Sequence, residues 1–484
     1  MSPTIFDNQI GTGLKKSRTG IKGFEELTNG GLPLNRSTIL VGATGTGKTI
    51  MAMEYIVNGA LQFNEPGVFM TFEEKTDDLC ENVKSLKYDL KRMVEEKKIV
   101  LEHLTVSHNE LHEIGKYNIE GLFHKLGEAI DSIQAKRVVL DSFDTLFSNF
   151  ETKSLRSEFI RLFSWLKEKK VTAIITAEMG NDSLTRLGIE ENIADCVIEI
   201  NNRVVNQIAV RRIRIIKYRG SIHANNEYPF LIDETGMTIF PIISQGMEQK
   251  TSTERLSTGI PTLDQMLENK GFYVGSNILI SGTAGTGKTS ITSSFACEVN
   301  KKNELVLYCA FEETPSQILR NMKSVGILMQ EHVDLKRLHF YYARPSLQNL
   351  ELHFLAIKDI IEKINPKVIV LDPITNLMTE GANSDVRSML TRFIDYLKTK
   401  QITGIFTAAI TIGTIAQNPS DEGISSMVDT WIMLTDSAMD GERTTMMYVM
   451  KSRGMKHSKS EMKLEINSTG LSFHPLSEEV TMKY

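Results

Sequence analysis

Two glycine-rich stretches of this chain have the residue types and spacing of phosphate-binding loops. GATGTGKT occupies residues 42–49 and GTAGTGKT occupies residues 282–289, each after an apolar run. In such a loop backbone N–H groups surround the phosphates at the start of a helix, the lysine contacts the β- and γ-phosphates, and the threonine binds Mg²⁺. We therefore expect two nucleotide sites, formed by Gly45, Thr46, Gly47, Lys48 and Thr49 and by Gly285, Thr286, Gly287, Lys288 and Thr289.

An aspartate ends a later apolar run in each half of the chain, Asp141 after VVL and Asp372 after VIVL. A carboxylate at this point would face the water shell of the nucleotide's metal ion. An aspartate after a strand can also cap the following helix. Because the two aspartates follow their glycine loops at similar intervals, we favour the role at the metal.

Paired glutamates follow another apolar run in each half. The motif FEE contains Glu73 and Glu74 in the first half and Glu312 and Glu313 in the second. A carboxylate after a strand that leaves the phosphate side can accept a proton from an attacking oxygen. Adjacent carboxylates on a loop are often only solvated charge, but the recurrence of FEE after equivalent runs favours a catalytic role.

Two cations lie late in each half, far in sequence from the glycine loop of that half. They are Lys217 and Arg219 in KYRG, and Lys451 and Arg453 in KSRG. Cations from a neighbouring molecule commonly complete a γ-phosphate site, which would require an oligomer. Charged residues that protect an edge strand explain the same pattern equally well at this stage.

These motifs recur because the chain is an internal repeat, in which LDSFDTLF at 140–147 is answered by LDPITNLM at 371–378. Each half alternates β-branched apolar runs with longer amphipathic stretches, which predicts an α/β fold with a mostly parallel sheet covered by helices on both faces. Later runs such as IAVRRIRIIKYRG alternate, so we expect antiparallel strands at the end of each sheet. The polar stretch 244–259 is typical of a linker and predicts domains at residues 1–247 and 248–484.

Composition narrows the class of protein. Hydrophobic residues at 41% and charged residues at 24% are globular values, and a net charge of −5 argues against nucleic acid as the main partner. The four cysteines form no CxxC pair, so neither zinc nor a disulfide framework is expected. No apolar run reaches the roughly 20 residues of a membrane helix, and the N-terminus lacks a signal-peptide layout, so we expect a cytoplasmic protein without a membrane partner.

Taken together, the duplicated GxxGTGKT loops, the FEE motifs, the LDS and LDP strand ends and the [KR]xRGxxH segments resemble the KaiC family, the RecA-like ATPases and autokinases of the circadian clock. The resemblance spans nearly the whole chain. It implies two tandem RecA-like P-loop NTPase domains, ATP and Mg²⁺ as cofactors, and a double-ring homohexamer with ATP between subunits in both tiers.

The resemblance also implies roles for individual residues. Lys217, Arg219 and His223 would reach the first-tier ATP of the adjacent subunit, and Lys451 and Arg453 would do so in the second tier. Ser85 would contact the first-tier nucleotide. Glu73 and Glu74 would position or deprotonate water for hydrolysis, while Glu312, beside Glu313, would face Mg²⁺ or accept a proton.

Residues 424–430, ISSMVDT, resemble the family segment whose Ser-Thr pair is phosphorylated by the ATP that the second tier of the adjacent subunit binds. Ser425 and Ser426 are therefore candidate phosphosites of a serine/threonine autokinase that could also act as an autophosphatase, with Ser420 and Asp421 where the family has a Thr-Asp pair. Val325 replaces a tryptophan near the second-tier base, which predicts looser nucleotide retention.

The resemblance further predicts partners. A KaiB-like protein on the first tier is expected, whereas a KaiA-like partner is not, because the chain stops at Tyr484 without the longer C-terminal segment of cyanobacterial members. Timing and stress signalling both remain open as the output. Two other functions share the P-loop core: a DnaB-like or RecA-like DNA-dependent ATPase, and a signalling scaffold assembled by ATP.

Overall fold

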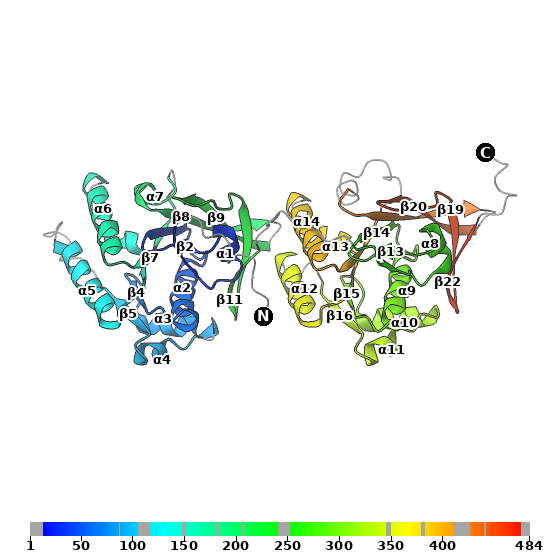
Figure 1. Ribbon diagram of the computed structural model, residues 1–484, viewed down its shortest axis with the longest axis horizontal. Coiled ribbons are helices and arrows are strands. Elements are labelled where there is room, and N and C mark those ends of the chain that lie inside the picture. The colour runs from blue at the N-terminus through cyan, green and yellow to red at the C-terminus, as the bar shows by residue number, and fades with distance from the viewer. Residues whose placement is uncertain are drawn as a thin grey trace. The chain divides into compact units, whose positions relative to one another are not determined.

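A computed structural model describes residues 13–86, 88–104, 117–147, 152–180, 183–205, 208–240, 252–344, 350–378, 383–410, 426–439 and 442–475. The chain divides into two compact units between residues 243 and 244, within the stretch 241–251 (Figure 1). The predicted boundary between residues 247 and 248 falls in that stretch, outside the described residues, and stays a prediction.

The first unit is built on a large sheet whose strands alternate with helices. Its strands are β3 (Ser37–Gly42), β4 (Gly67–Thr71), β5 (Ile99–His103), β6 (Arg137–Asp141), β7 (Thr172–Glu178), β8 (Cys196–Val205), β9 (Ile208–Tyr218), β10 (Glu227–Asp233) and β11 (Gly236–Ile239). Their order across the sheet is β11-β10-β9-β8-β3-β7-β6-β4-β5. The strands from β8 to β5 are parallel, and β10 runs antiparallel to both β9 and β11.

Helices cover both faces of this sheet. They are α1 (Phe24–Thr28), α2 (Lys48–Gln62), α3 (Thr76–Asn82), α4 (Leu90–Glu95), α5 (Tyr117–Ile133), α6 (Thr152–Glu168) and α7 (Glu190–Ile193), with 3₁₀ helices η2 (Val83–Leu86) and η3 (Phe143–Phe147). Successive residues of β3 point to opposite faces. Leu40 packs into the core that includes α2, while Ile39 and Val41 pack into the core that includes α5 and α6.

The second unit repeats this plan. Its sheet, in the order β16-β15-β17-β18-β14-β19-β20-β21-β22, contains β14 (Asn277–Gly282), β15 (Val306–Ala310), β16 (Leu338–Tyr342), β17 (Val368–Asp372), β18 (Thr403–Ala409), β19 (Thr430–Met439), β20 (Glu442–Ser452), β21 (Met462–Asn467) and β22 (Gly470–Pro475). The strands from β16 to β19 are parallel, and β20, β21 and β22 are antiparallel. Its helices are α8 (Pro261–Met266), α9 (Lys288–Lys301), α10 (Pro315–Ser324), α11 (Met329–Asp334), α12 (Leu350–Ile364), α13 (Thr375–Met378) and α14 (Asn383–Thr399).

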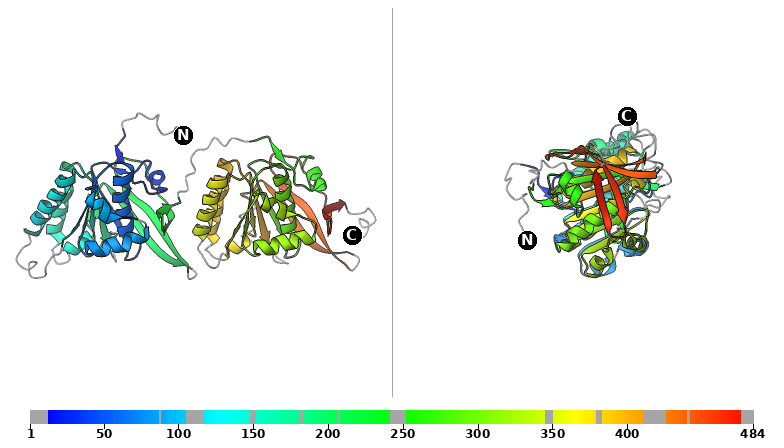
Figure 2. Two further views of the ribbon diagram at one scale, coloured as in Figure 1. Left: turned by 90° about the horizontal axis from the view of Figure 1, so that it is seen from below. Right: turned by 90° about the vertical axis from the view of Figure 1, so that its right-hand side faces the viewer.

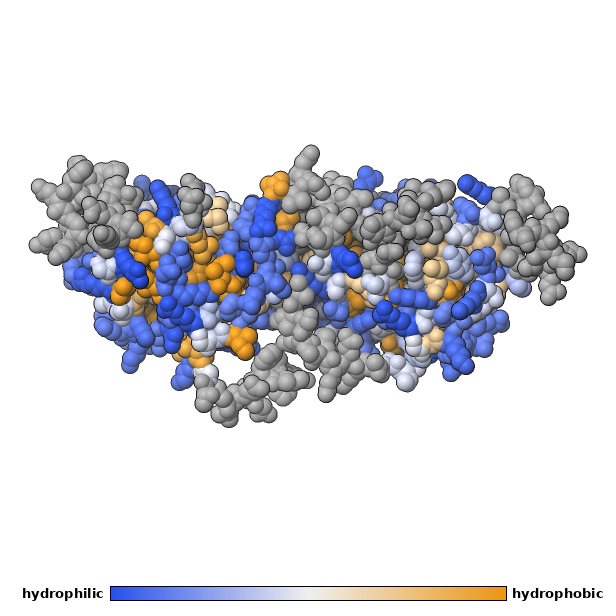
Figure 3. Space-filling model, turned by 90° about the horizontal axis from the view of Figure 1, so that it is seen from above, coloured by the Kyte–Doolittle hydropathy of each residue, from blue (hydrophilic) through white to orange (hydrophobic). Residues whose placement is uncertain are grey.

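A two-stranded ladder lies beside each large sheet, β1 (Lys16–Ser17) with β2 (Leu32–Pro33) and β12 (Arg255–Leu256) with β13 (Phe272–Tyr273). The predicted α/β fold of two mostly parallel sheets, each ending in antiparallel strands and flanked by helices, is confirmed (Figure 2). None of the helices in the described part of the chain combines the length and the apolar character needed to cross a membrane. On the face drawn in Figure 3, exposed apolar side chains lie among hydrophilic ones.

Candidate functional site

Both glycine loops join a strand to a helix, β3 to α2 and β14 to α9, as predicted. Gly47 immediately precedes α2 with φ at 107°, and Gly287 precedes α9 with φ at 86°. These left-handed conformations are ones that side chains other than glycine rarely adopt. Each loop therefore brings backbone N–H groups to a helix N-terminus, where an anion binds favourably.

The two lysines lie over their own loops in the same way. Lys48 Nζ donates to the carbonyl oxygens of Gly42 and Ala43 at 2.7 and 3.1 Å. Lys288 Nζ donates to the equivalent carbonyl oxygens of Gly282 and Thr283 at 2.8 and 2.7 Å. Burial lowers the pKa of both lysines, and nearby carboxylates offset part of that change. Each ammonium group therefore lies beside the carbonyl oxygens of its own loop and near several carboxylates.

A hydroxyl–carboxylate pair lies beside each lysine. Thr49 Oγ1 donates to Asp141 at 3.0 Å, and Thr289 Oγ1 donates to Asp372 at 2.9 Å. Burial raises the pKa of Asp141, while hydrogen bonds from Thr176 and Thr49 lower it in part. Oxygen donors of this kind are the ligands that Mg²⁺ prefers. The threonine and the aspartate predicted for the metal in each unit are therefore in contact beyond the ends of β3 and β6, and of β14 and β17. Glu312, also predicted for the metal, is exposed.

Threonines from the neighbouring strand hold each aspartate, and the sequence analysis did not single them out. Thr176 in β7 donates to Asp141 at 2.8 Å, and Thr407 in β18 donates to Asp372. In the second unit Tyr308 also donates to Asp372 at 2.6 Å. The signal for the threonines was present, because both lie in the TA pair near the end of equivalent strands in the repeat.

The second glutamate of each pair is held by an asparagine eight residues later. Asn82 Nδ2 donates to Glu74, and Asn321 Nδ2 donates to Glu313 at 3.2 Å. The first glutamates, Glu73 and Glu312, are exposed. This repeated contact, which sequence reasoning missed, orients one carboxylate of each pair and leaves the other at the surface.

Ser85 and His223 lie on exposed or half-buried segments of the first unit. Ser85, in η2, is exposed and donates to the carbonyl oxygen of Asn82 at 3.3 Å, so it belongs to the segment that holds Glu74. His223 packs its ring beside Tyr218, with centroids 6.4 Å apart, and its Nδ1 lies 3.1 Å from the carbonyl oxygen of Ala224.

The late cations of the first unit lie at the other end of the sheet from its glycine loop. Lys217 Nζ donates to the carbonyl oxygens of Glu191 and Asn192 at 2.9 and 3.1 Å, just before β8 begins. The backbone N–H of Arg219 donates to the carbonyl oxygen of Asp195 at 2.8 Å. Burial lowers the pKa of Lys217, and the adjacent Arg219 lowers it further. We call this end, where the parallel strands start, the amino edge.

A strand's length therefore separates each late cation from its own glycine loop. The Asp195 N–H donates to the carbonyl oxygen of Ser37, the first residue of β3, while the loop begins after Gly42, its last residue. Six residues of parallel strand span roughly 17 Å. An arginine side chain is much shorter than this, so Arg219 cannot reach a nucleotide bound by its own unit.

The second unit has the same arrangement, with one addition. The Arg453 N–H donates to the carbonyl oxygen of Asp429 at 2.8 Å, and its Nη2 donates to the carbonyl oxygen of Ser426 at 2.9 Å. Burial lowers the pKa of Lys451, as does the neighbouring Arg453. Ser426 is exposed, and Ser425, Ser420 and Asp421 lie outside the described residues. The amino edge of this unit thus carries both a late cation and a predicted phosphosite.

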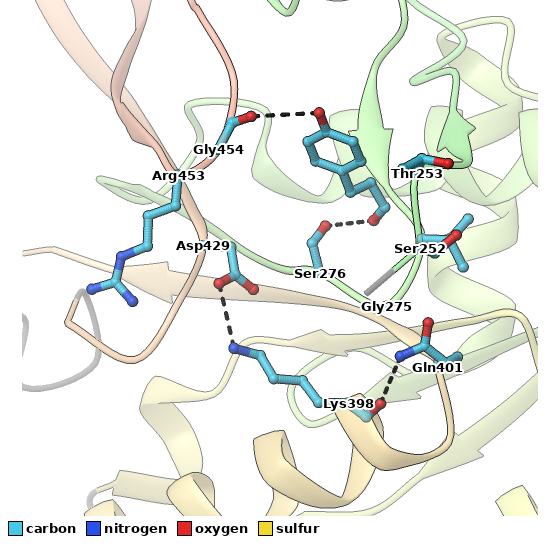
Figure 4. A pocket seen from close by; sticks show the side chains of 11 residues that line it. Ser252, Thr253, Gly275, Ser276, Lys398, Gln401, Asp429, Arg453 and Gly454 are labelled. Carbon is cyan, nitrogen blue, oxygen red and sulfur yellow. Dashed lines mark hydrogen bonds and ion pairs between the residues drawn. The ribbon is translucent and has the colours of Figure 1, made fainter. Parts of the chain in front are cut away.

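Beside Arg453 the amino edge is hollowed by a cavity of about 360 Å³ (Figure 4). Lys398 pairs with Asp429 across it at 3.3 Å. In the first unit Arg36, which occupies the place of Ser276 in the repeat, pairs with Asp195 at 3.0 Å. Ser276, which lines the cavity, donates instead to the carbonyl oxygen of Tyr273 at 2.6 Å.

Several known proteins are similar to this chain over most of its length. The family model for the KaiC ATPase matches residues 17–244 and 256–478. The circadian clock protein KaiC2 of Synechocystis sp. is 43% identical over 468 residues, which cover 96% of this chain and 82% of that protein. The circadian clock oscillator protein KaiC of Synechococcus elongatus is 33% identical over 460 residues, which cover 94% of this chain and 88% of that protein.

Proposed function

This chain belongs to the KaiC family of ATPases, and we propose that it hydrolyses ATP in its first unit and uses ATP in its second to phosphorylate its own Ser425 and Ser426. The proposal makes it an ATPase and a serine autokinase that works between subunits. The observation that carries it is the hydrogen bond from Arg453 to the backbone of Ser426 at the amino edge of the second sheet.

That hydrogen bond favours transfer between subunits over transfer within one. Lys288 and Thr289 begin α9, just beyond the loop that follows the last residue of β14. Arg453 contacts Asp429, whose N–H donates to the carbonyl oxygen of Asn277 at the start of that strand. Six residues of parallel strand again span roughly 17 Å. A subunit would therefore present Ser426 and Arg453 together to the ATP of its neighbour, which supports the reading of the late cations as residues that act in trans.

Mg²⁺ fits the donors present in each unit. Thr49 with Asp141, and Thr289 with Asp372, would hold it, with Glu312 as a further candidate in the second unit. When bound, Mg²⁺ neutralises charge on the β- and γ-phosphates. The lysine of each loop would move from the loop carbonyls to the phosphates, and the loop N–H groups would bind the phosphate oxygens.

The nucleophile distinguishes the two proposed reactions. In the first unit water attacks the γ-phosphorus, the bond to the β–γ bridging oxygen breaks, and Glu73 or Glu74 takes the proton. In the second unit the hydroxyl of Ser425 or Ser426 attacks, ADP leaves, and Glu312 or Glu313 takes the proton. Hydroxyls and water are weak nucleophiles, so in-line placement and a nearby base must supply most of the acceleration.

We propose assembly into a double-ring homohexamer, because a site completed in trans requires neighbouring subunits to meet and the resemblance to the family implies that ring. Ile222, between Arg219 and His223, is 87% exposed, which is unusual for a large apolar side chain next to functional cations. A neighbouring subunit would cover it. The names of the relatives place them in the circadian clock, so we propose a timing role, with a KaiB-like protein as a partner of the first tier.

Mixed hexamers test transfer between subunits. One protein carries Ser425→Ala and Ser426→Ala with an intact second site, and the other keeps both serines but carries Glu312→Gln and Glu313→Gln. After incubation with ATP and Mg²⁺ and verified subunit exchange, phosphate should appear on the second protein only in the mixture. Phosphate on that protein when it is alone, or none in the mixture, would contradict the proposal.

A further inference from the structure

The turn that carries the late arginine of the first unit is attached to the start of the chain. Residues 219–224, which we call the cation turn, follow β9 and include Arg219, Ser221 and Ile222. Lys16 in β1 donates from Nζ to Ser221 Oγ at 2.6 Å. Because Arg219 is exposed and Ile222 is 87% exposed, the cation turn lies at the surface of its unit.

Lys16 is itself held by contacts that do not involve the cation turn. β1 pairs with β2, with Lys16 opposite Pro33. Lys16 Nζ also donates to the carbonyl oxygens of Thr28 and Asn29 at 2.6 and 2.9 Å, at the end of α1. A cation is favourable there, since the last carbonyl groups of a helix have no partner within it. The ammonium group therefore links the end of α1 to the cation turn.

Further contacts attach the two ends of the cation turn to the same part of the chain. Tyr218, the last residue of β9, donates from its hydroxyl to the carbonyl oxygen of Gly31 at 2.9 Å, and Lys16 Nζ lies 5.0 Å from the centroid of its ring. The Ala224 N–H donates to the carbonyl oxygen of Leu27 at 2.9 Å. These contacts hold the turn where it begins and ends, whereas the hydrogen bond from Lys16 holds its middle.

The second unit repeats this link with different side chains. Arg255 in β12 aligns with Lys16, and Met455 aligns with Ser221, two residues after the late arginine. Arg255 Nη2 donates to Met455 Sδ at 3.1 Å and to the carbonyl oxygen of Leu267, at the end of α8, at 2.9 Å. A cation thus joins a helix end to the turn in both units, although both residues of the contact differ.

The rest of the second turn is also attached as in the first unit. The Ser458 N–H donates to the carbonyl oxygen of Met266 at 2.9 Å, as the equivalent N–H of the first unit does to α1. The Tyr273 hydroxyl donates to the carbonyl oxygen of Gly454, next to the late arginine, at 3.4 Å (Figure 4). The recurrence of these contacts indicates that the turn which carries a late arginine is held in place in each unit.

We propose that Lys16 is a positioning residue for the action of Arg219 in trans, because it fixes the turn from which that arginine extends toward the neighbouring subunit. The inference rests on the proposed function, in which Arg219 acts on a phosphoryl group bound by the adjacent subunit. Lys16 acts through the turn and not on the nucleotide itself. Placement across an interface has to be close, since a misplacement of about 1 Å can cost about 10²-fold in rate.

The test uses full-length variants. Lys16→Met removes the ammonium group, whereas Ser221→Ala removes only the hydroxyl that it contacts and leaves the hydrogen bonds to α1 in place. Lys15→Met, at the exposed neighbouring lysine, is the matched control. We expect steady-state ATP hydrolysis to fall about 10-fold in Lys16→Met and about threefold in Ser221→Ala, and to be unchanged in the control.

Mixing of subunits separates a positioning role from a loss of folding. Lys16→Met keeps its glycine loop and Lys48→Ala keeps its cation turn. After verified subunit exchange, a mixture of the two should therefore exceed the summed activity of its components. A mixture of Lys16→Met with Arg219→Ala should show no such gain, because neither protein then supplies an effective turn. If Lys16→Met does not fold, Ser221→Ala takes its place in both mixtures with the same expected results.

Three results would overturn the inference. They are unchanged hydrolysis in Ser221→Ala, which would limit Lys16 to capping α1, no gain in the mixture with Lys48→Ala, and a gain in the mixture with Arg219→Ala. The mixture of Arg219→Ala with Lys48→Ala separates this inference from the proposed function. If that mixture gains activity and the mixture of Lys16→Met with Lys48→Ala does not, only the role of Lys16 is wrong. If it gains none, the proposed action of Arg219 in trans is wrong.

Discussion

Asn321 lies eight residues after Glu313 and donates to its carboxylate at 3.2 Å, a contact that Asn82 and Glu74 repeat in the first unit. A carboxylate that must accept a proton from an attacking oxygen has to be oriented before the reaction begins. The exposed partner in each pair, Glu73 or Glu312, lacks this restraint among the contacts described. We infer that the second glutamate of each pair is the better oriented base.

The first prediction concerns these asparagines. Asn82→Ala should lower steady-state ATP hydrolysis by about 10-fold, because Glu74 loses the donor that orients it, and should leave phosphorylation of Ser426 unchanged. Asn321→Ala should instead lower phosphorylation of Ser426 by about 10-fold and leave steady-state ATP hydrolysis unchanged. Both activities are measured on each variant, and equal effects of the two substitutions on hydrolysis would contradict the pairing.

The second prediction concerns the cations at the amino edge. Arg219→Ala should reduce hydrolysis by about 10²-fold or more, because an arginine supplied in trans stabilises charge on the transferred phosphoryl group. In mixtures with a Lys48→Ala protein, activity should partly return, since each protein supplies the half-site that the other lacks. If no mixture exceeds the summed activity of its components, Arg219 does not act in trans.

The third prediction concerns assembly. Ile222→Asp should weaken the oligomer, because it places a charge where a neighbouring subunit would cover an apolar side chain that is 87% exposed. Light scattering with ATP and Mg²⁺ measures the mass, and Ile160→Asp, at a residue that is 46% exposed on α6, serves as the matched control. A monomeric parent protein in saturating nucleotide would rule out the ring itself.

The fourth prediction concerns Glu54 in α2, which is buried and accepts a hydrogen bond from the Met237 N–H at 2.7 Å. Burial raises the pKa of this carboxyl from 4.5 to about 7, and the Met237 hydrogen bond offsets part of the rise. The folded protein therefore holds a proton that the unfolded chain releases, so Glu54 costs stability increasingly as the pH rises from about 4.5 to about 7.

Glu54→Gln removes this cost and keeps the acceptor for Met237. Its free energy of unfolding should exceed that of the parent by on the order of 2 kcal/mol at pH 8 and by much less at pH 5. Denaturant unfolding at the two pH values measures the difference. A gain that is independent of pH would show that Glu54 does not titrate in this range.

Much of the nucleotide site was determined by the sequence alone. Glycines that flank a lysine and a threonine specify a loop at a helix start by local backbone conformation, and the apolar run before Asp141 specifies a buried strand by burial on both faces. The internal repeat strengthened each of these predictions, because every motif occurs at the equivalent place in both halves of the chain. The parallel sheets and their helical layers followed from the same periodicity.

The tertiary structure decided which of those residues meet. Thr176 is marked only by its place in the repeat and Asn82 has no signature as a single residue, and only the register of β7 beside β6 and the turn of α3 bring them to the site. Sequence spacing likewise left Arg219 and Arg453 as either edge protection or trans cations. The strand order shows that both arginines lie at the amino edge. Because the length of a parallel strand separates this edge from the glycine loop, neither arginine can reach a nucleotide bound by its own unit.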